Sequence, residues 1–131
     1  MNDPFTAISC LECLRVALIR VGGRRIPSPY RYDKEGRLRV VAETTDFAGL
    51  AAAAPNQIRQ YGRGSIAVVV RLLDVVARVR EQLPRAKDCA ILLEHARAAR
   101  EDGLAAAENE RDQRDIEARF AAAQSALTRD R

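Results

Sequence analysis

SIAVVVRLLDVVARVREQL, residues 65–83, is the most apolar long stretch of this 131-residue chain. Within it, Arg71, Asp74, Arg78 and Glu81 recur at spacings of three and four residues, which places them on one narrow stripe of a helix. Valine, leucine and isoleucine hold most of the other positions. A helix that is apolar around most of its circumference is buried on several sides. The stretch therefore predicts a central helix that forms the core.

The segment directly before this helix is polar and ends in two glycines, and core packing does not account for it. Backbone N–H groups at a helix start are free to bind an anion, and two arginines lie close to this one in sequence. The segment is therefore a candidate anion site, which comprises Gln57, Arg59, Tyr61, Gly62, Arg63, Gly64 and Ser65. Two alternatives stay open. In the first, the glycines form only a tight turn, and Arg59 and Gln57 bond to the hairpin described below or to Asp3. In the second, Arg59, Tyr61 and Arg63 form a contact surface for a partner.

The first helix is predicted over residues 4–21. Asp3 suits the N-cap, Pro4 suits the first helical position, and the two glycines at 22–23 end the helix. Its apolar positions form a wide face and its polar positions are few, so we expect this helix to be largely buried.

A second helix is predicted over residues 47–61, with Thr45 or Asp46 as its cap. Pro55 lies inside it and lacks the N–H group that would bond one turn back. A kink or a break is expected at that point.

Between these helices, residues 30–32 and 37–42 alternate in the manner of strands, and residues 33–36 form a turn that ends in glycine. A two-stranded hairpin is marginal in water when it stands alone. We therefore expect it to lie on the helices, with Leu38 and Val40 facing inward and the neighbouring arginines outward.

Two helices complete the chain. The fourth is predicted over residues 88–102, capped by Asp88 and ended by Gly103. The fifth starts within residues 105–110 and runs to about residue 127, with a solvated lattice of charges around one apolar stripe (Ile116, Phe120, Ala123 and Leu127).

The predicted fold class is mainly α: a bundle of about five helices with one small β-hairpin at residues 30–42, in a single soluble domain over residues 1–131. The length suits one domain. A hydrophobic fraction of 47% with only 5% aromatics predicts a core of small aliphatic residues between closely spaced helices. No run of about 18 apolar residues predicts a membrane span, and no signal peptide is evident.

The net charge of +4 is concentrated in residues 1–64, which hold ten basic and six acidic side chains, whereas residues 65–131 hold twelve of each. This excess is too small and too diffuse to predict a nucleic-acid partner. It fits an anionic ligand, or a position close to an anionic cytoplasmic membrane face.

Few residues in the chain could carry chemistry. Cys10 and Cys13 form a C-x-x-C pair, but it lies inside a helix, where no helix N-terminus lowers a thiol pKa. A metal site would need Cys89 and His95 as well, and six residues apart on one helix these two point in different directions. The cysteines are therefore interpreted as buried small hydrophobes and His95 as a helix surface residue. No metal and no cofactor are expected.

Four segments carry a family resemblance: residues 2–7 (Asn-Asp-Pro-Phe-Thr-Ala), 27–33, 36–40 and 57–64. In this order they resemble a bacterial family of predicted membrane proteins, catalogued as domain of unknown function 2254. The similarity runs from residue 2 to about residue 83, and continues as helices only to the end. The resemblance implies that the chain corresponds to the soluble C-terminal portion of these proteins, on the cytoplasmic side of the inner membrane. Their upstream membrane helices are absent from this sequence. No catalytic residue is established for the family, so none is carried over.

These observations predict a non-enzymatic assembly or interaction module. It would form a homo-oligomer, or bind the membrane-embedded upstream region or membrane partners. One alternative is a sensor of a small anion or phosphate-bearing ligand at the 59–65 turn. The other is an enzyme of unknown type that uses Asp3, Arg59 and Tyr61.

Overall fold

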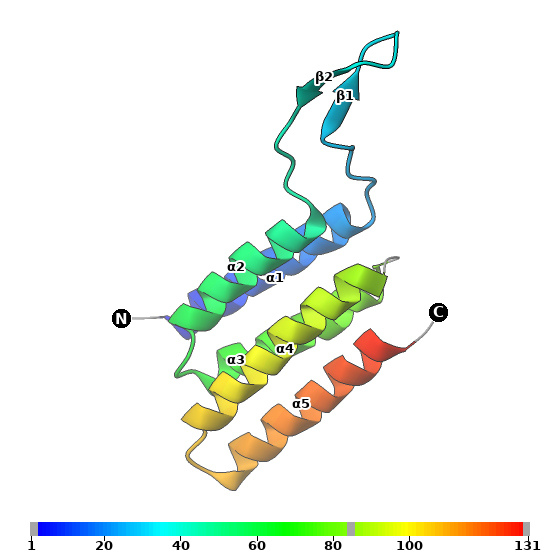
Figure 1. The fold of residues 1–131 in the computed structure, drawn as a ribbon. Helices are drawn as coiled ribbons and strands as arrows, with labels where there is room; N and C mark the ends of the chain where they lie inside the picture. The colour runs from blue at the N-terminus through cyan, green and yellow to red at the C-terminus, as the bar shows by residue number, and fades with distance from the viewer. Residues whose placement is uncertain (1–2, 84–85, 130–131) are drawn as a thin grey trace.

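The computed structural model describes residues 3–83 and 86–129 and confirms the predicted fold class. It contains five helices and one two-stranded antiparallel hairpin (Figure 1). Met1 and Asn2, where the recognised opening segment begins, lie outside the described residues.

The helices run back and forth along one common direction and are joined by short connections, except where the hairpin intervenes (Figure 1). In chain order the elements are α1 (Pro4–Gly22), β1 (Tyr30–Tyr32), β2 (Leu38–Val41), α2 (Phe47–Tyr61), α3 (Ile66–Arg80), α4 (Ala86–Ala106) and α5 (Glu110–Thr128).

The central position predicted for the apolar stretch is confirmed. Helix α3 packs against α1, α4 and α5, and its valines and leucines are buried on several sides. Its charged stripe pairs across helices, with Arg71 Nη2 2.6 Å from Glu12 on α1 and Asp74 Oδ1 3.1 Å from Arg119 on α5. The stripe therefore fixes the lateral order of the bundle while the apolar side chains fill its interior.

Glycines allow the helices to approach one another closely. A Cβ atom on Gly103 would lie 2.7 Å from Cγ1 of Val69, and one on Gly62 would lie 2.5 Å from Cγ1 of Val68. Gly103 was expected to end α4, but the helix continues past it to Ala106. Its role is to let α4 pack against α3 and α5.

Two further features of the helices differ from the predictions. Helix α2 does not break at Pro55, which is buried in the bundle, so packing offsets the missing backbone hydrogen bond; a kink there stays a prediction. Helix α4 begins at Ala86 instead of being capped by Asp88, which is 1% exposed inside the structure.

The expectation that α1 is largely buried was also wrong. Only Leu11, Leu18 and Gly22 of this helix are buried, whereas Phe5 is 82% exposed and Val16 is 40% exposed. The reason is geometric: α1 lies at the edge of the bundle, beside α2 and α3, and turns one whole side outward (Figure 1).

The hairpin stands away from the helices instead of lying on them (Figure 1). Every residue of both strands is exposed. The register shifts by one residue between Arg31 and Tyr32, so that Tyr32 pairs with Leu38 and Arg31 pairs with Val40. Because paired residues share a face of the ribbon, Leu38 and Val40 lie on opposite faces. The prediction that both face inward was therefore wrong on two counts.

Candidate functional site

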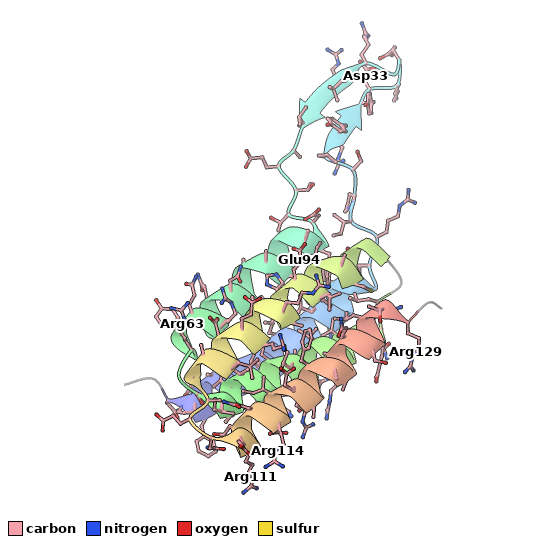
Figure 2. The ribbon with its side chains drawn as sticks, turned by 60° about the horizontal axis from the view of Figure 1, so that its bottom comes forward. Asp33, Arg63, Glu94, Arg111, Arg114 and Arg129 are labelled. Atoms are coloured by element: carbon pink, nitrogen blue, oxygen red, sulfur yellow. The ribbon has the colours of Figure 1, made fainter. Side chains whose placement is uncertain are left out.

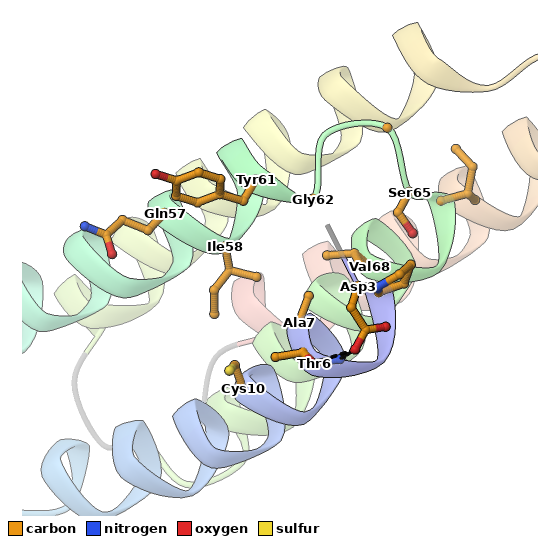
Figure 3. A pocket seen from close by; sticks show the side chains of 13 residues that line it. Asp3, Thr6, Ala7, Cys10, Gln57, Ile58, Tyr61, Gly62, Ser65 and Val68 are labelled. Carbon is orange, nitrogen blue, oxygen red and sulfur yellow. Dashed lines mark hydrogen bonds between the residues drawn. The ribbon is translucent and has the colours of Figure 1, made fainter. Parts of the chain in front are cut away.

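A groove of about 970 Å³ lies where the first turn of α1, the last turn of α2 and the first turn of α3 meet (Figure 3). It brings together the two segments that stand out in the sequence, at the start of the chain and at residues 57–65. The lining residues are Asp3, Pro4, Thr6, Ala7, Cys10, Gln57, Ile58, Tyr61, Gly62, Gly64, Ser65, Ile66 and Val68.

Among the residues that the structure describes, Asp3 is the single charged side chain that lines this groove. Its carboxylate caps α1 by accepting bonds from the backbone N–H groups of Phe5 (3.0 Å) and Thr6 (3.1 Å), and from the Thr6 hydroxyl (2.5 Å). The Thr6 hydroxyl and the Phe5 amide together hold the pKa of Asp3 below its usual range. The groove therefore carries a negative charge at neutral pH.

The first turn of α3 supplies donors to the same groove. Ser65 occupies the N-cap position, but its side chain makes no capping hydrogen bond. The backbone N–H groups of Ile66 and Ala67 have no acceptor among the described residues. These are the free amides expected of an uncapped helix start.

The two arginines of the predicted site do not line the groove, because their side chains bind Asp102 on α4. Arg59 forms an ion pair with Asp102, and Nη2 of Arg63 lies 3.5 Å from the second carboxylate oxygen of the same residue. The partner of Arg59 is therefore neither the hairpin nor Asp3. Five of the seven predicted residues line the groove, whereas the two that would supply positive charge do not.

Of the two glycines of the turn, Gly62 is explained by packing and not by an unusual backbone angle, whereas neither explains Gly64. Gly62 has φ −90°, which any residue adopts, but a Cβ there would also lie 3.0 Å from the carbonyl oxygen of Ile58. Around Gly64 there is open space. Among the described residues, the only positive φ belongs to Gly36 in the hairpin turn, where it was predicted.

Beside the groove, the exposed residues on one side of the bundle carry no charge. We call it the uncharged face, and it consists of the exposed residues of α1 up to Ala17 and those of α2: Pro4, Phe5, Thr6, Ser9, Cys10, Cys13, Val16, Ala17, Gly49, Leu50, Ala53, Gln57, Gln60 and Tyr61. The charged residues of the two helices lie outside this set. Glu12 and Arg15 pair with each other at the α3 side, Arg59 pairs with α4, and the exposed Arg20 lies beyond Ala17 in the last turn of α1, where it borders the face.

The opposite side of the bundle has the composition of an ordinary solvated surface. The exposed positions of α5 include Glu110, Arg111, Arg114, Asp115 and Arg119, and two of these arginines are seen to point outward in Figure 2. In a chain that is 31% charged, four helical turns of α1 without one exposed charge are not explained by solvation. Apolar surface gathered in this way is typical of a surface that a partner covers.

The cysteines and the histidine do not form a joint site. Cys10 and Cys13 are exposed on the uncharged face, so their interpretation as buried hydrophobes was wrong, whereas Cys89 is buried. His95 lies half-buried on α4, where burial and the charge of Arg59 lower its pKa. No three metal-ligating side chains come together within residues 3–83 and 86–129.

Comparison with known families places this geometry in context. The model of the predicted membrane protein family DUF2254, a domain of unknown function, matches residues 1–78. The chain belongs to this family. No curated protein and no solved structure matches it.

The part of this DUF2254 chain that matches the family contains the groove, the uncharged face and the hairpin. Helix α5 and its charged surface lie beyond the match. None of the described helices is both long enough and apolar enough to span a bilayer.

The uncharged face could not be recognised from the sequence. Its apolar residues on α1 show the same helical spacing as a buried face, and periodicity alone does not separate the two. Nothing in the sequence around Asp102 indicated that it is the partner of both Arg59 and Arg63.

Proposed function

We propose that this DUF2254 chain is a non-enzymatic assembly module whose uncharged face packs against a second copy of the chain. The observation that carries the proposal is the lack of any exposed charge along α1 from Pro4 to Ala17 and along α2. The cores of protein interfaces are depleted of charge in the same way. The exposed ring of Phe5, at 82%, is the kind of apolar side chain that anchors such a contact.

A second copy fits this face because the face needs no complementary charge. Two copies related by a twofold axis would place the same patch on itself, which is the commonest arrangement of soluble oligomers. Along α1, Ser9, Cys13 and Ala17 follow one another at four-residue spacing and would let two helices approach closely.

The size of the face suits a weak dimer. On α1 the face extends from Pro4 to Ala17, so it is about 21 Å long at roughly 1.5 Å per residue. Two helices packed about 10 Å apart present a strip roughly 20 Å wide. Two copies would therefore bury on the order of 800 Å² in total, which is the size of a weak or transient interface.

The placement of the other residues supports a non-enzymatic role. Asp3 and Tyr61 border the groove, but Arg59 is bound to Asp102 on α4, so the three residues considered for catalysis do not converge. We further propose that the module works at the cytoplasmic face of the inner membrane, where membrane-embedded regions of the same family would be its neighbours.

Sedimentation velocity of the full chain tests the proposal. Val16→Glu places a charge on the face, and Ala122→Glu makes the same change at an exposed position of α5. We expect dimers for the wild type and for Ala122→Glu, and a monomer for Val16→Glu with an unchanged circular dichroism spectrum. A wild type that stays monomeric at high concentration contradicts self-association. A folded, dimeric Val16→Glu variant contradicts this face.

A second candidate function, ligand sensing at the 57–65 segment, is favoured by the groove itself and by the free amides of Ile66 and Ala67. The negative charge of Asp3 within the groove disfavours an anion there. Thermal unfolding with and without inorganic phosphate distinguishes the two cases. Stabilisation by phosphate that Arg63→Ala removes and Arg114→Ala keeps would support sensing, whereas no shift in the wild type would contradict it.

A further inference from the structure

The hairpin is the least explained part of the fold. It projects beyond the ends of the helices, and the labelled Asp33 at its tip lies far from the bundle (Figures 1 and 2). Tyr30, Tyr32, Leu38, Val40 and Val41 are between 49% and 62% exposed. A two-stranded ribbon with so much exposed apolar surface is at best marginally stable in water. We therefore expect this ribbon to be stabilised by an environment other than water.

Apolar side chains project from both faces of the ribbon. The strand register places Tyr30, Tyr32, Leu38 and Val41 on one face, and Val40 on the other beside Arg31. A folded protein partner would cover one face of such a ribbon and leave the other in water. A fluid lipid interface can surround both faces at once.

The charge of the hairpin is positive and is arranged around these apolar residues. Residues 24–43 hold six basic and three acidic side chains, so they carry +3 of the chain's +4. One of the acids, Asp33, is occupied within the hairpin, where its carboxylate accepts bonds from Arg39 Nε (2.8 Å) and Arg37 Nε (3.2 Å). Arg24 and Arg25 are exposed at the base of the ribbon.

This combination has a known physical preference. Tyrosines favour the level of the lipid head groups, where their rings meet apolar chains and their hydroxyls meet water. Arginines lay their aliphatic stems along apolar surface while their guanidinium groups reach outward to anionic head groups. The mixture of tyrosine, aliphatic and arginine side chains therefore matches an anionic membrane surface.

We propose that residues 24–43 form a membrane-surface anchor that inserts the hairpin into the head-group layer of an anionic bilayer. The proposal rests on the hairpin alone and is independent of self-association through the uncharged face. It goes beyond the assembly function by assigning a lipid surface as a second partner.

Tryptophan fluorescence provides a direct test, because the natural chain contains no tryptophan. Tyr32→Trp and Val40→Trp report on the two faces of the ribbon, and Ala122→Trp on α5 is the control. The probes are vesicles of phosphatidylcholine alone, or of phosphatidylcholine with a third of phosphatidylglycerol. We expect a blue shift of both hairpin reporters with the anionic vesicles and none for the control.

Charge variants test the electrostatic part by vesicle co-sedimentation. A basic residue near an anionic membrane contributes roughly fivefold to affinity, so Arg24→Ala/Arg25→Ala should weaken binding by about 25-fold. The matched variant Arg111→Ala/Arg114→Ala removes the same charge from α5 and should bind as the wild type does.

The outcomes separate the possible partners. Unshifted hairpin reporters with anionic vesicles overturn the proposal. So does a shift that depends on protein concentration and not on lipid, because it would assign the ribbon to a protein contact. A blue shift of only one reporter also overturns it, since insertion into lipid surrounds both faces. Equal loss of binding in the two double-arginine variants would mean that the net charge of the chain, and not the hairpin, binds lipid.

Discussion

The turn between α2 and α3 contains two glycines that the structure treats differently, and this difference yields a sharp prediction. A Cβ on Gly62 would lie 2.5 Å from Cγ1 of Val68 and 3.0 Å from the carbonyl oxygen of Ile58. Val68 is 2% exposed and branched at Cβ, and the other contact is backbone, so neither atom can move aside easily. A Cβ on Gly64 would meet no heavy atom within 4 Å apart from those of its chain neighbours.

The magnitude follows from these contacts. Overpacking of this kind costs about 1–3 kcal/mol, and the lower entropy of the unfolded alanine chain returns about 0.5–1 kcal/mol. Gly62→Ala should therefore lower the free energy of unfolding by on the order of 1–2 kcal/mol. Gly64→Ala should change the free energy of unfolding by less than about 0.5 kcal/mol, and a change of this size would raise it.

Urea unfolding followed by circular dichroism measures both variants under the same conditions. Equal stability of Gly62→Ala and Gly64→Ala would refute the reasoning, because it would mean that α2 and α3 do not approach closely at this turn. A large loss in Gly64→Ala would equally contradict it, by showing that backbone freedom and not packing selects glycine there.

Two further predictions concern the polar contacts of α4. Asp102→Asn should lower the free energy of unfolding by about 1–3 kcal/mol, because it leaves the half-buried Arg59 without its charge partner. Asp115→Asn, which breaks an exposed pair on α5, should cost about 0.5 kcal/mol or less, and urea titrations compare the two. Burial lowers the pKa of His95 below 6.5 in the folded chain. As the pH falls, the imidazole is therefore protonated in the unfolded chain before it is protonated in the folded chain. The free energy of unfolding should therefore fall as the pH drops below about 6.5, by at most about 1.4 kcal/mol per pH unit. Between pH 7 and 5, the free energy of unfolding should depend less on pH in His95→Gln than in the wild type.

The number and order of the helices could be predicted from the sequence because each is encoded locally. The apolar surround of residues 66–79, the cap at Asp3 and the positive φ of Gly36 are all visible without tertiary information. Pro55 shows the limit of such rules, since its buried ring keeps α2 continuous in spite of a lost hydrogen bond.

Features that depend on which element is a neighbour could not be predicted. The spacing of Phe5 and Val16 on α1 is that of a core face, yet no helix covers them. Leu38 and Val40 have the alternation of a half-buried strand, but the register shift separates them. Arg59 was a candidate ligand-binding residue, but its partner in the structure lies 43 residues away on α4. The position of a segment in the sequence therefore indicated where the groove is, but not its charge.

Native mass spectrometry of the purified chain is the measurement that bears most directly on the assembly proposal. We expect a species of twice the chain mass without added mass, which persists in Ala122→Glu and disappears in Val16→Glu. A spectrum that shows only the monomer at every concentration would rule out self-association. A dimer that withstands Val16→Glu would contradict the proposal, since the uncharged face would then not be the surface that holds the two copies together.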